Sequence, residues 1–411
     1  MSLNDTPSGE RIHIGFFGRR NAGKSSVVNA VTGQELAVVS DTKGTTTDPV
    51  KKAMELLPIG PVMVIDTPGF DDVGALGEQR VKKTKQILNR TDVAVLTIDA
   101  MEGLQQCDHE LIAIFKEKQI PFLLVYNKMD LLERIPEEKE GEIYVSALKQ
   151  ERIYELKERI ASIARVADNR LQLVGDLIHP SDLVILVIPI DKAAPKGRLI
   201  LPQQQVIRDV LEADGAAICV KEYELRDVLD RLGTVPAMVI TDSQVFAKVS
   251  ADVPASIPLT SFSILMARYK GLLDTAVEGV TAIDSLKDGD KILIAEGCTH
   301  HRQCDDIGSV KIPRWLRNYT GKTLEIETCS GQSFPEDLSS YALVIHCGGC
   351  MLNEREVRYR MKCAKDQGIP ITNYGIAIAF MQGILKRSIQ MFPHLSSLFQ
   401  ENDDRRLIVS R

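Results

Sequence analysis

The sequence predicts an α/β protein of three domains, each built on a mostly parallel sheet flanked by helices. Two observations lead to this class. Apolar runs of strand length alternate with helix-like stretches along the whole chain, and fully apolar runs such as Leu183 to Ile190 suit strands that are covered on both faces. Changes in motif content along the chain place the expected domains at residues 1–167, 168–270 and 271–411.

Composition narrows the class of protein. The chain has 411 residues, of which 44% are hydrophobic, and a formal net charge of -6 without a long basic run. This balance argues against a nucleic-acid or membrane partner. The amino terminus lacks an apolar signal core, and no apolar run approaches the roughly 20 residues of a spanning helix. We therefore expect a cytoplasmic protein, in which eight cysteines indicate metal or redox chemistry rather than disulfides.

Residues 12–32 read as a strand, a glycine loop and a helix. The loop from Gly18 to Ser25 fits the pattern G-x-x-x-x-G-K-S, which predicts a P-loop domain. In such a loop the backbone N–H groups and the helix amino terminus face the β-phosphate of a nucleotide. Lys24 would bridge the β- and γ-phosphates, and the hydroxyl of Ser25 would reach magnesium. The predicted nucleotide contacts in this stretch are Gly18, Asn21, Ala22, Gly23, Lys24, Ser25 and Ser26.

Three further loops follow in the order that a GTP-binding domain requires. In the DTPG motif after the strand at 62–65, an aspartate would hold the magnesium shell and a glycine would sense the γ-phosphate. In the NKMD motif after the strand at 122–126, the carboxylate can accept hydrogen bonds from guanine N1 and its exocyclic amine, which adenine does not offer. A Ser-Ala pair completes the base site. The predicted contacts are Asp66, Gly69, Asn127, Lys128, Asp130, Ser146 and Ala147.

These motifs resemble the translation-factor-related class of small GTPases, particularly the branch of tRNA-modification and ribosome-assembly GTPases. Gly44 to Asp48 is similar to the first switch of that branch, which would make Thr46 a magnesium ligand and, with Lys24, a catalytic residue. The resemblance also implies that Asn21 helps to hold a potassium ion in place of an arginine finger, whereas by itself Asn21 would be a loop-capping residue. Phe70 stands where many GTPases have a water-orienting glutamine, so we expect slow hydrolysis.

The middle of the chain continues the strand and helix alternation without a phosphate loop or a catalytic constellation. We expect strands at Leu183 to Ile190, Ala216 to Val220 and Ala237 to Thr241. Cys219, inside the second of these strands, is interpreted as a small core residue. A domain without chemistry of its own, between two domains that have it, suggests a dimerisation module and hence a homodimer.

In the last domain, chemistry-bearing side chains follow two predicted strands. Cys298 and His300 come after Lys291 to Ala295, and His346 to Cys350 comes after Tyr341 to Ile345. Because parallel strands end at one edge of a sheet, three thiols and one or two imidazoles can meet at a single metal site. From these residue types alone, structural zinc remains an alternative. Four other residues are not expected to be ligands, because they lie away from a strand end or within a helix: His301, Cys304, Cys329 and Cys363.

The pattern Cys298-x-His300, then 45 residues, then His346-Cys347-x-x-Cys350 resembles the signature of the HydF family, the maturation GTPases of iron-iron hydrogenases. The similarity extends over the whole chain. It implies that Cys298, Cys347 and Cys350 hold a 4Fe-4S cluster, with His300 and His346 as weak fourth ligands or as hydrogen-bonding groups around it. Three thiolates leave one iron with an exchangeable ligand, which suits a site that accepts and releases another group.

The resemblance therefore implies a GTP-hydrolysing scaffold and carrier. It would receive a di-iron precursor from two radical-SAM maturases and pass it to apo FeFe-hydrogenase, using GTP, Mg²⁺, K⁺ and the 4Fe-4S cluster, with the di-iron precursor as cargo. One alternative is an RNA-modification or ribosome-assembly GTPase with a structural zinc domain, against which the acidic charge argues. Another is a redox enzyme that uses the cluster for electron transfer, although such clusters usually have four thiolates.

Overall fold

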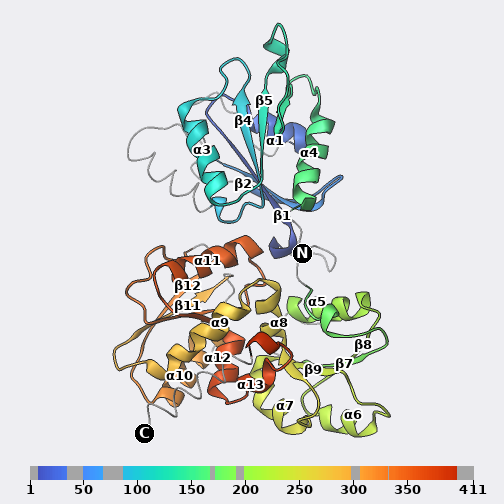
Figure 1. Ribbon diagram of the computed structural model, residues 1–411, viewed down its shortest axis with the longest axis vertical. Helices are drawn as coiled ribbons and strands as arrows, with labels where there is room; N and C mark the ends of the chain where they lie inside the picture. The colour runs from blue at the N-terminus through green and yellow to red at the C-terminus, as the bar shows by residue number, and fades with distance from the viewer. Residues whose placement is uncertain are drawn as a thin grey trace. The chain divides into compact units, whose positions relative to one another are not determined.

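The fold is described from a computed structural model, which covers residues 8–34, 50–67, 87–166, 172–190, 199–297, 306–331 and 333–395. The backbone separates into two compact units, Met1–Asn169 and Arg170–Arg411 (Figure 1). Within the described residues there are three sheets, each accompanied by helices, so the α/β class is confirmed. No helix in these ranges is both long enough and apolar enough to cross a membrane.

The first unit contains a six-stranded sheet in the order β2-β3-β1-β4-β5-β6, in which only the β2 and β3 pair is antiparallel. Its helices α1 and α4 pack on one face of the sheet, and α3 packs on the other. The strands are β1 (Ile12–Gly18), β2 (Val50–Leu56), β3 (Gly60–Asp66), β4 (Val93–Asp99), β5 (Phe122–Asn127) and β6 (Glu142–Tyr144). The helices are α1 (Lys24–Thr32), α3 (Gln106–Glu117) and α4 (Ile153–Val166).

The central strands of this sheet are buried in the core of the first unit. All seven residues of β4 are buried, as expected for a parallel strand covered by helices on both faces. The register pairs Phe16 with Asp66 and Asp99 with Asn127, so the carboxyl ends of β3, β4 and β5 lie along one edge. This edge is where an open α/β sheet binds its ligand.

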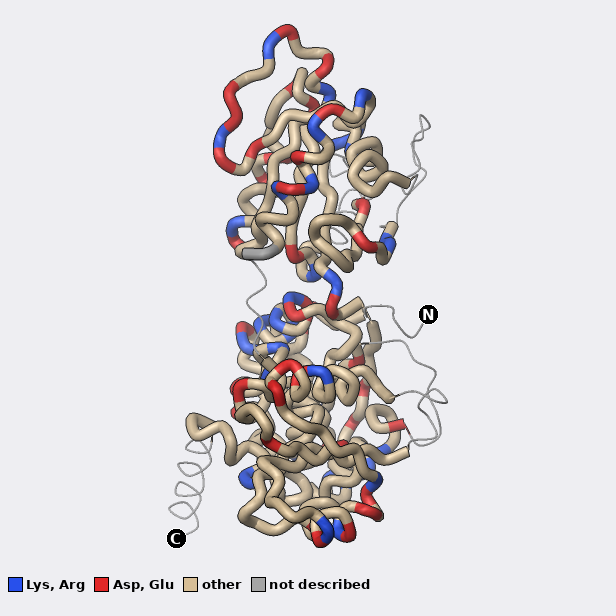
Figure 2. Tube along the Cα trace, turned by 90° about the vertical axis from the view of Figure 1, so that its right-hand side faces the viewer, with Lys and Arg blue, Asp and Glu red and all other residues tan. Residues whose placement is uncertain are grey.

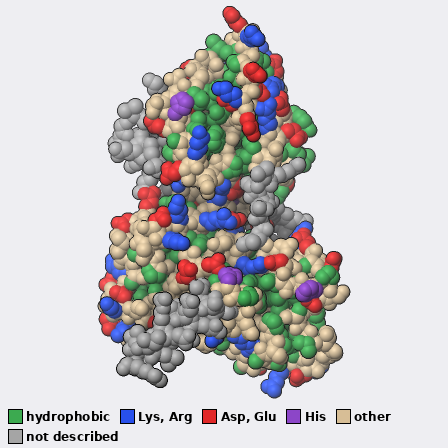
Figure 3. All heavy atoms as spheres, viewed as in Figure 1, with side chains coloured by type: hydrophobic (Ala, Val, Ile, Leu, Met, Phe, Trp, Pro, Cys, Tyr) green, Lys and Arg blue, Asp and Glu red, His purple; other side chains and the backbone are tan. Residues whose placement is uncertain are grey.

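The second unit contains two four-stranded sheets, ordered β10-β9-β7-β8 and β12-β11-β13-β14, with every strand pair parallel. The first has β7 (Leu183–Val187), β8 (Ala216–Val220), β9 (Met238–Thr241) and β10 (Leu259–Ser261), with α5 (Leu201–Glu212), α6 (Leu225–Arg231), α7 (Phe246–Asp252) and α8 (Phe262–Tyr269). Figure 3 shows hydrophobic side chains gathered on the visible face of the region around this first sheet, where Figure 1 labels α6, β7, β8 and β9.

The second sheet of this unit has α11 on one face and α9, α10 and α12 on the other. Its strands are β11 (Lys291–Glu296), β12 (Glu325–Ser330), β13 (Leu343–His346) and β14 (Ile371–Asn373). Its helices are α9 (Leu273–Val280), α10 (Ile312–Thr320), α11 (Glu354–Asp366), α12 (Tyr374–Met381) and α13 (Leu385–Ser388). One apolar core runs through both sheets, from β7 and β9 to β11 and β13. Burial of this shared core stabilises the two sheets as one unit.

Six short helices complete the described structure. They are η1 (Ser8–Glu10), η2 (Met129–Leu131), η3 (Gly175–Leu177), η4 (Ser243–Val245), η5 (Thr281–Ser285) and η6 (Ile307–Lys311). Lys and Arg are interspersed with Asp and Glu along the described parts of both units (Figure 2).

Two predictions for the second unit were wrong in detail. β7 ends at Val187 rather than at Ile190, because Pro189 has no N–H to donate to a neighbouring strand. Cys219 is exposed rather than in the core, because β8 is an edge strand with much of its surface open.

Candidate functional site

The P-loop lies between β1 and α1, at the carboxyl edge of the first sheet. Gly23 has φ 79°, and a Cβ atom there would lie 2.2 Å from Nδ2 of Asn127, so only glycine fits. Asn21 also has a positive φ, of 63°. The helix α1 begins directly afterwards at Lys24, which leaves the N–H groups of its first turn facing the loop. This arrangement suits a bound phosphate.

Lys24 and Asp66 meet at this edge. The Nζ atom of Lys24 forms an ion pair with the carboxylate of Asp66, which ends β3. Lys24 is buried, so its ammonium group needs an anionic partner. The residues expected for the phosphates and for magnesium are therefore neighbours, and the phosphates and Mg²⁺ of a nucleotide can take over the two halves of this pair.

Asn127 joins the P-loop to the base loop. Its Nδ2 donates a hydrogen bond to the carbonyl of Ala22 at 3.1 Å, and its Oδ1 accepts one from the N–H of Ala147 at 3.0 Å. Asn127 is buried. A single amide thus holds together the phosphate end and the base end of the nucleotide site.

The remaining NKMD residues frame the base. Lys128 has φ 67°, and its Nζ donates to Oδ2 of Asp99 at 2.6 Å. Burial works to raise the pKa of Asp99, but the Lys128 hydrogen bond and the N–H of Met101 outweigh it, so this pKa is lowered. Asp130 lies on η2, half-buried, and no side chain or backbone group of the described residues bonds to its carboxylate. That carboxylate remains available to a base.

The structure thus brings together Gly18, Asn21, Ala22, Gly23, Lys24, Ser25, Ser26, Asp66, Asn127, Lys128, Asp130, Ser146 and Ala147 along the strand ends of one sheet. Thr46, Gly69 and Phe70 lie outside the described residues.

Sequence reasoning missed Arg19, a variable position of the P-loop pattern. Its guanidinium donates to Asp108 Oδ2 at 3.0 Å, to Glu102 Oε2 at 2.7 Å and to the carbonyl of Gly103 at 3.1 Å. Asp108 is buried in the first turn of α3. Arg19 therefore braces the P-loop against the start of α3, a contact that no local pattern signals.

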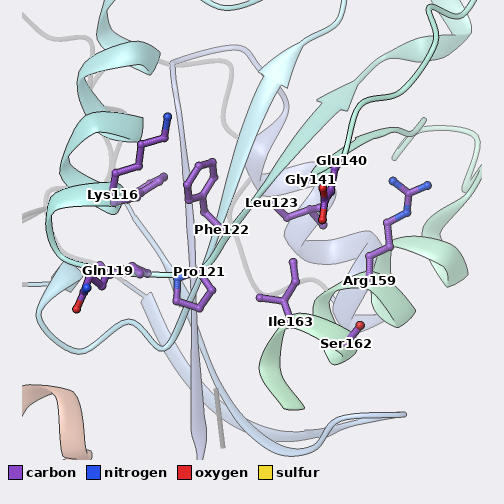
Figure 4. Close-up of a pocket in the computed structure, with 12 residues that line it drawn as sticks. Lys116, Gln119, Pro121, Phe122, Leu123, Glu140, Gly141, Arg159, Ser162 and Ile163 are labelled. Atoms are coloured by element: carbon purple, nitrogen blue, oxygen red, sulfur yellow. The ribbon is translucent and has the colours of Figure 1, made fainter. Parts of the chain in front are cut away.

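A cavity of about 630 Å³ in the same unit lies at the amino-terminal end of β5, away from Asn127 (Figure 4). Phe122, Pro121 and Ile163 give it an apolar floor, with Lys116 and Arg159 at its sides. It belongs to the opposite end of the strands from the nucleotide edge.

In the second unit, the segment from Cys347 to Cys350, called the thiol loop here, follows β13 directly. The sulfur of Cys347 accepts hydrogen bonds from the N–H of Gly297 at 3.0 Å and of Gly349 at 3.4 Å. Gly297 follows β11, the neighbouring strand. The thiol loop and the end of β11 are therefore in direct contact at the carboxyl edge of the sheet.

The two cysteines of the loop are half-buried. Burial raises the pKa of Cys347, and burial together with the charge of Cys347 raises the pKa of Cys350 to about 11. Lys270, itself buried, opposes the latter shift and donates from Nζ to the carbonyl of Leu352 at 3.0 Å. Free thiols here are neutral at pH 7, so a soft metal would bind with release of protons.

His346 ends β13 and is buried, with both ring nitrogens engaged. Nδ1 lies 2.6 Å from the carbonyl of Cys347, and Nε2 lies 3.2 Å from Nη1 of Arg360. Burial and the charge of Arg360 lower the pKa of His346 to about 4, so the ring is neutral at pH 7. Of the two roles expected for His346, hydrogen bonding around the thiol loop is the one that this geometry favours.

The placement expected for Cys329 was wrong. It lies in β12, one residue before the strand ends, and pairs with Ala295 of β11. The first residues of β12 alternate between exposed and partly buried, so no fully apolar run marks the strand in the sequence. Burial raises the pKa of Cys329 to about 11. Cys363 lies on α11 as expected.

Cys298, His300, His301 and Cys304 lie outside the described residues. Among the residues that are described, no three His, Cys, Asp or Glu side chains form a group that could hold a metal ion.

Comparison with known families identifies the second unit. Residues 173–271 match the hydrogen maturase F dimerization domain, and residues 274–391 match the hydrogen maturase F tetramerization domain. The two matches together span more than half of the chain. The chain belongs to the hydrogen maturase F (HydF) family. Residues 13–128 match the 50S ribosome-binding GTPase family, so this HydF chain carries a GTPase domain at its amino-terminal end.

The curated relatives of the chain include GTPases. The tRNA modification GTPase MnmE of Clostridioides difficile is 30% identical over 55% of this chain and 48% of its own length. GTPase Der of Clostridium botulinum is 35% identical over 32% of this chain and 30% of its own length. The chain thus spans less than half the length of these relatives.

Among solved structures, a probable GTP-binding protein engB is 23% identical with a TM-score of 0.31, and covers 38% of this chain and 99% of its own. Aquifex aeolicus Era is 20% identical with a TM-score of 0.34, and covers 54% of this chain and 98% of its own. With TM-scores this low, the assignment of the GTPase fold rests on the strand order and the P-loop described above.

Proposed function

We propose that this HydF protein is a GTP-hydrolysing scaffold that binds a 4Fe-4S cluster, assembles the di-iron precursor and transfers it to apo FeFe-hydrogenase. One observation carries the proposal. The sulfur of Cys347 accepts a hydrogen bond from Gly297, the residue directly before Cys298. The described end of β11 therefore lies beside the thiol loop, and Cys298 is the next residue in the sequence. Cys298, Cys347 and Cys350 are the proposed ligands.

The residues of the loop suit an anionic thiolate centre. The N–H groups of Gly297 and Gly349 point at the sulfur of Cys347, where they would stabilise its thiolate. Gly349 has φ 65°, a left-handed conformation that favours glycine in this loop. A 4Fe-4S cluster held by three thiolates would supply one iron with an exchangeable ligand. His346 and His300 are proposed to act around this centre rather than being required as ligands.

In the GTPase domain we propose that GTP is hydrolysed with Mg²⁺ held by Ser25, Thr46 and Asp66. Lys24 and Thr46 would stabilise charge on the phosphates, and Asn21 would help to hold K⁺. The helix amino terminus and the P-loop N–H groups orient the phosphates, and Asp130 selects guanine. Slow hydrolysis is proposed because Phe70 cannot orient a water molecule.

We further propose a cytoplasmic homodimer with three functional parts, at residues 1–167, 168–270 and 271–411. The exposed edge strand β8, with exposed Leu211 and Tyr223 nearby, supports the second part as the dimerisation surface. The two radical-SAM maturases and apo FeFe-hydrogenase are the proposed partners, without nucleic acid or membrane.

An RNA-modification or ribosome-assembly GTPase with a structural zinc site is the second candidate. The 30% identity to the tRNA modification GTPase MnmE favours it. Binding to RNA at moderate salt, with tightly held zinc, would support this candidate.

Metal analysis and EPR spectroscopy of anaerobically purified, dithionite-reduced protein distinguish the two candidates. The scaffold predicts about four irons per chain and a reduced cubane signal. Cys347→Ser or Cys350→Ser should abolish both, whereas Cys363→Ser, a matched change on α11, should leave them intact. Stoichiometric zinc without iron would refute the cluster proposal.

A further inference from the structure

A buried ionic network lies directly behind the thiol loop. Arg360, on α11, is 0% exposed, and its ion-pair partner Glu356 is 5% exposed. The Nε atom of Arg360 donates to Glu356 Oε1 at 2.9 Å, Nη1 lies 3.2 Å from His346 Nε2, and Nη2 donates to the carbonyl of Gly331. The guanidinium also lies 5.0 Å from the ring centre of Phe334. Every side of this cation is therefore occupied by the protein.

The network fixes where the proton of His346 sits. A guanidinium has only donors, so Nε2 of His346 must accept from Arg360. The neutral ring then carries its proton on Nδ1, where it donates to the carbonyl of Cys347 at 2.6 Å. Arg360 is thus linked through one imidazole to the backbone of the first cysteine in the thiol loop.

The same backbone segment is held at a second point. The sulfur of Cys347 accepts from Gly297, and the N–H of Cys347 donates to the carbonyl of Ala295 at 2.8 Å. The carbonyl of Cys347 is the group that the β11 contacts do not hold, and His346 holds it. Loss of the Nδ1–H tautomer of His346 would therefore release the carbonyl of Cys347, while β11 would still hold the N–H and the sulfur of the same residue.

We propose that Arg360 is a positioning residue for metal binding at the thiol loop, acting by locking His346 in the Nδ1–H tautomer that holds the carbonyl of Cys347. This inference rests on the proposed function, because it assumes that the loop binds a thiolate-ligated metal. It also assigns His346 to the second layer of the site, since ligation through Nε2 would require Arg360 to leave.

A second ion pair on the same helix offers a comparison for the buried one. Glu354 and Arg358 form an ion pair with the same spacing and residue types, yet Arg358 is exposed. An apolar pair could fill the space of Glu356 and Arg360 at similar stability, because a buried ion pair recovers little more than its desolvation cost. Only the guanidinium, however, offers donors both to His346 and to the Gly331 carbonyl.

The test uses Co²⁺, whose thiolate charge-transfer band reports sulfur ligation, with the full-length apo-protein. Arg360→Met should weaken Co²⁺ binding by about 10- to 100-fold, the usual effect of losing a group that orients a metal ligand. Arg358→Met is the matched control and should bind within twofold of the wild type. Cys347→Ser should lose the band, which assigns the band to the thiol loop.

A double variant guards against misfolding. Glu356→Leu combined with Arg360→Met leaves no unpaired buried charge, so it should melt close to the wild-type temperature while still binding Co²⁺ more weakly. In addition, ¹⁵N NMR spectra of histidine-labelled apo-protein should show His346 as the Nδ1–H tautomer in the wild type and a mixture of tautomers in the double variant. A merely structural role would leave Co²⁺ affinity unchanged in the folded double variant.

The inference is overturned if the folded double variant binds Co²⁺ within twofold of the wild type, or if the wild type shows no thiolate band. Failure of the proposed function gives a different result. In that case Co²⁺ affinity would still depend on Arg360, but iron and sulfide would yield no 4Fe-4S signal in the wild type.

Discussion

Gly23→Ala is the change that tests the nucleotide site most directly. An Ala at φ 79° costs about 1–2 kcal/mol, because left-handed backbone crowds a Cβ atom. That Cβ would also lie 2.2 Å from Nδ2 of Asn127, so the hydrogen bond from Asn127 to Ala22 must break, which costs about another 1 kcal/mol. The sum of about 2–3 kcal/mol predicts a loss of GTP and GDP affinity of roughly 30- to 150-fold.

Titration with a fluorescent guanine nucleotide measures this loss. Gly33→Ala is the matched control, because Gly33 also has a positive φ, of 65°, but a Cβ atom there would meet no atom of the described residues within 4 Å beyond its own chain neighbours. The control should lower the melting temperature while leaving nucleotide affinity within about twofold of the wild type. Equal affinities for the two variants would refute the claim that Gly23 is required by its contact with Asn127.

Three other predictions concern base selection, the monovalent cation and pH. Asp130→Asn should reduce GTP affinity at least about 100-fold and improve binding of xanthosine triphosphate, because the amide can donate to the extra carbonyl; unchanged preference for guanine in competition binding would contradict the assignment. Replacing sodium with potassium should raise GTP turnover severalfold in the wild type but not in Asn21→Ala, and equal rates in both salts would remove the role proposed for Asn21. Burial acts to raise the pKa of the Glu138 carboxyl in the folded state, but hydrogen bonds from Arg152 and Arg159 outweigh burial and lower this pKa to about 2. Glu138 should therefore contribute to stability above about pH 4.5 and lose that contribution as the pH falls toward about 2. After discounting for solvent, the contribution is about 1–2 kcal/mol, and urea unfolding of Glu138→Gln should show a flatter pH profile than the wild type between these values.

The placement of the described nucleotide-site residues at strand ends could be predicted from the sequence because the motifs are local. Each motif is a strand end followed by a loop of fixed length, and the strands are apolar runs that only a covered parallel sheet accommodates. Lys24, Asp66 and Asn127 therefore lie along one sheet edge, where the strand order places Lys24 between Asp66 and Asn127. Arg19 escaped notice because its partners, Glu102 and Asp108, lie more than 80 residues away and belong to no motif.

The thiol loop could be predicted from its cysteines and glycines, but its surroundings could not. The position of Cys329 near the end of β12 was not recognised, since a half-exposed edge strand alternates polar and apolar residues and has no clean end. Cys219 was misread for the same reason, because strand composition does not tell an edge strand from a central one.

Local pattern was sufficient for the α/β class and for the GTPase domain, because the lengths of strands and loops are properties of short stretches of chain. Local pattern also led to the proposal of Cys347 and Cys350 as ligands. The hydrogen-bonding role proposed for His346 comes only from packing. From the sequence alone, a histidine at this position could be a metal ligand or a hydrogen-bonding group. The hydrogen-bonding role follows from the contact of Nε2 with Arg360, which lies fourteen residues later on α11. Because burial excludes water as a hydrogen-bond partner, the guanidinium that the fold places beside the ring decides which ring nitrogen carries the proton.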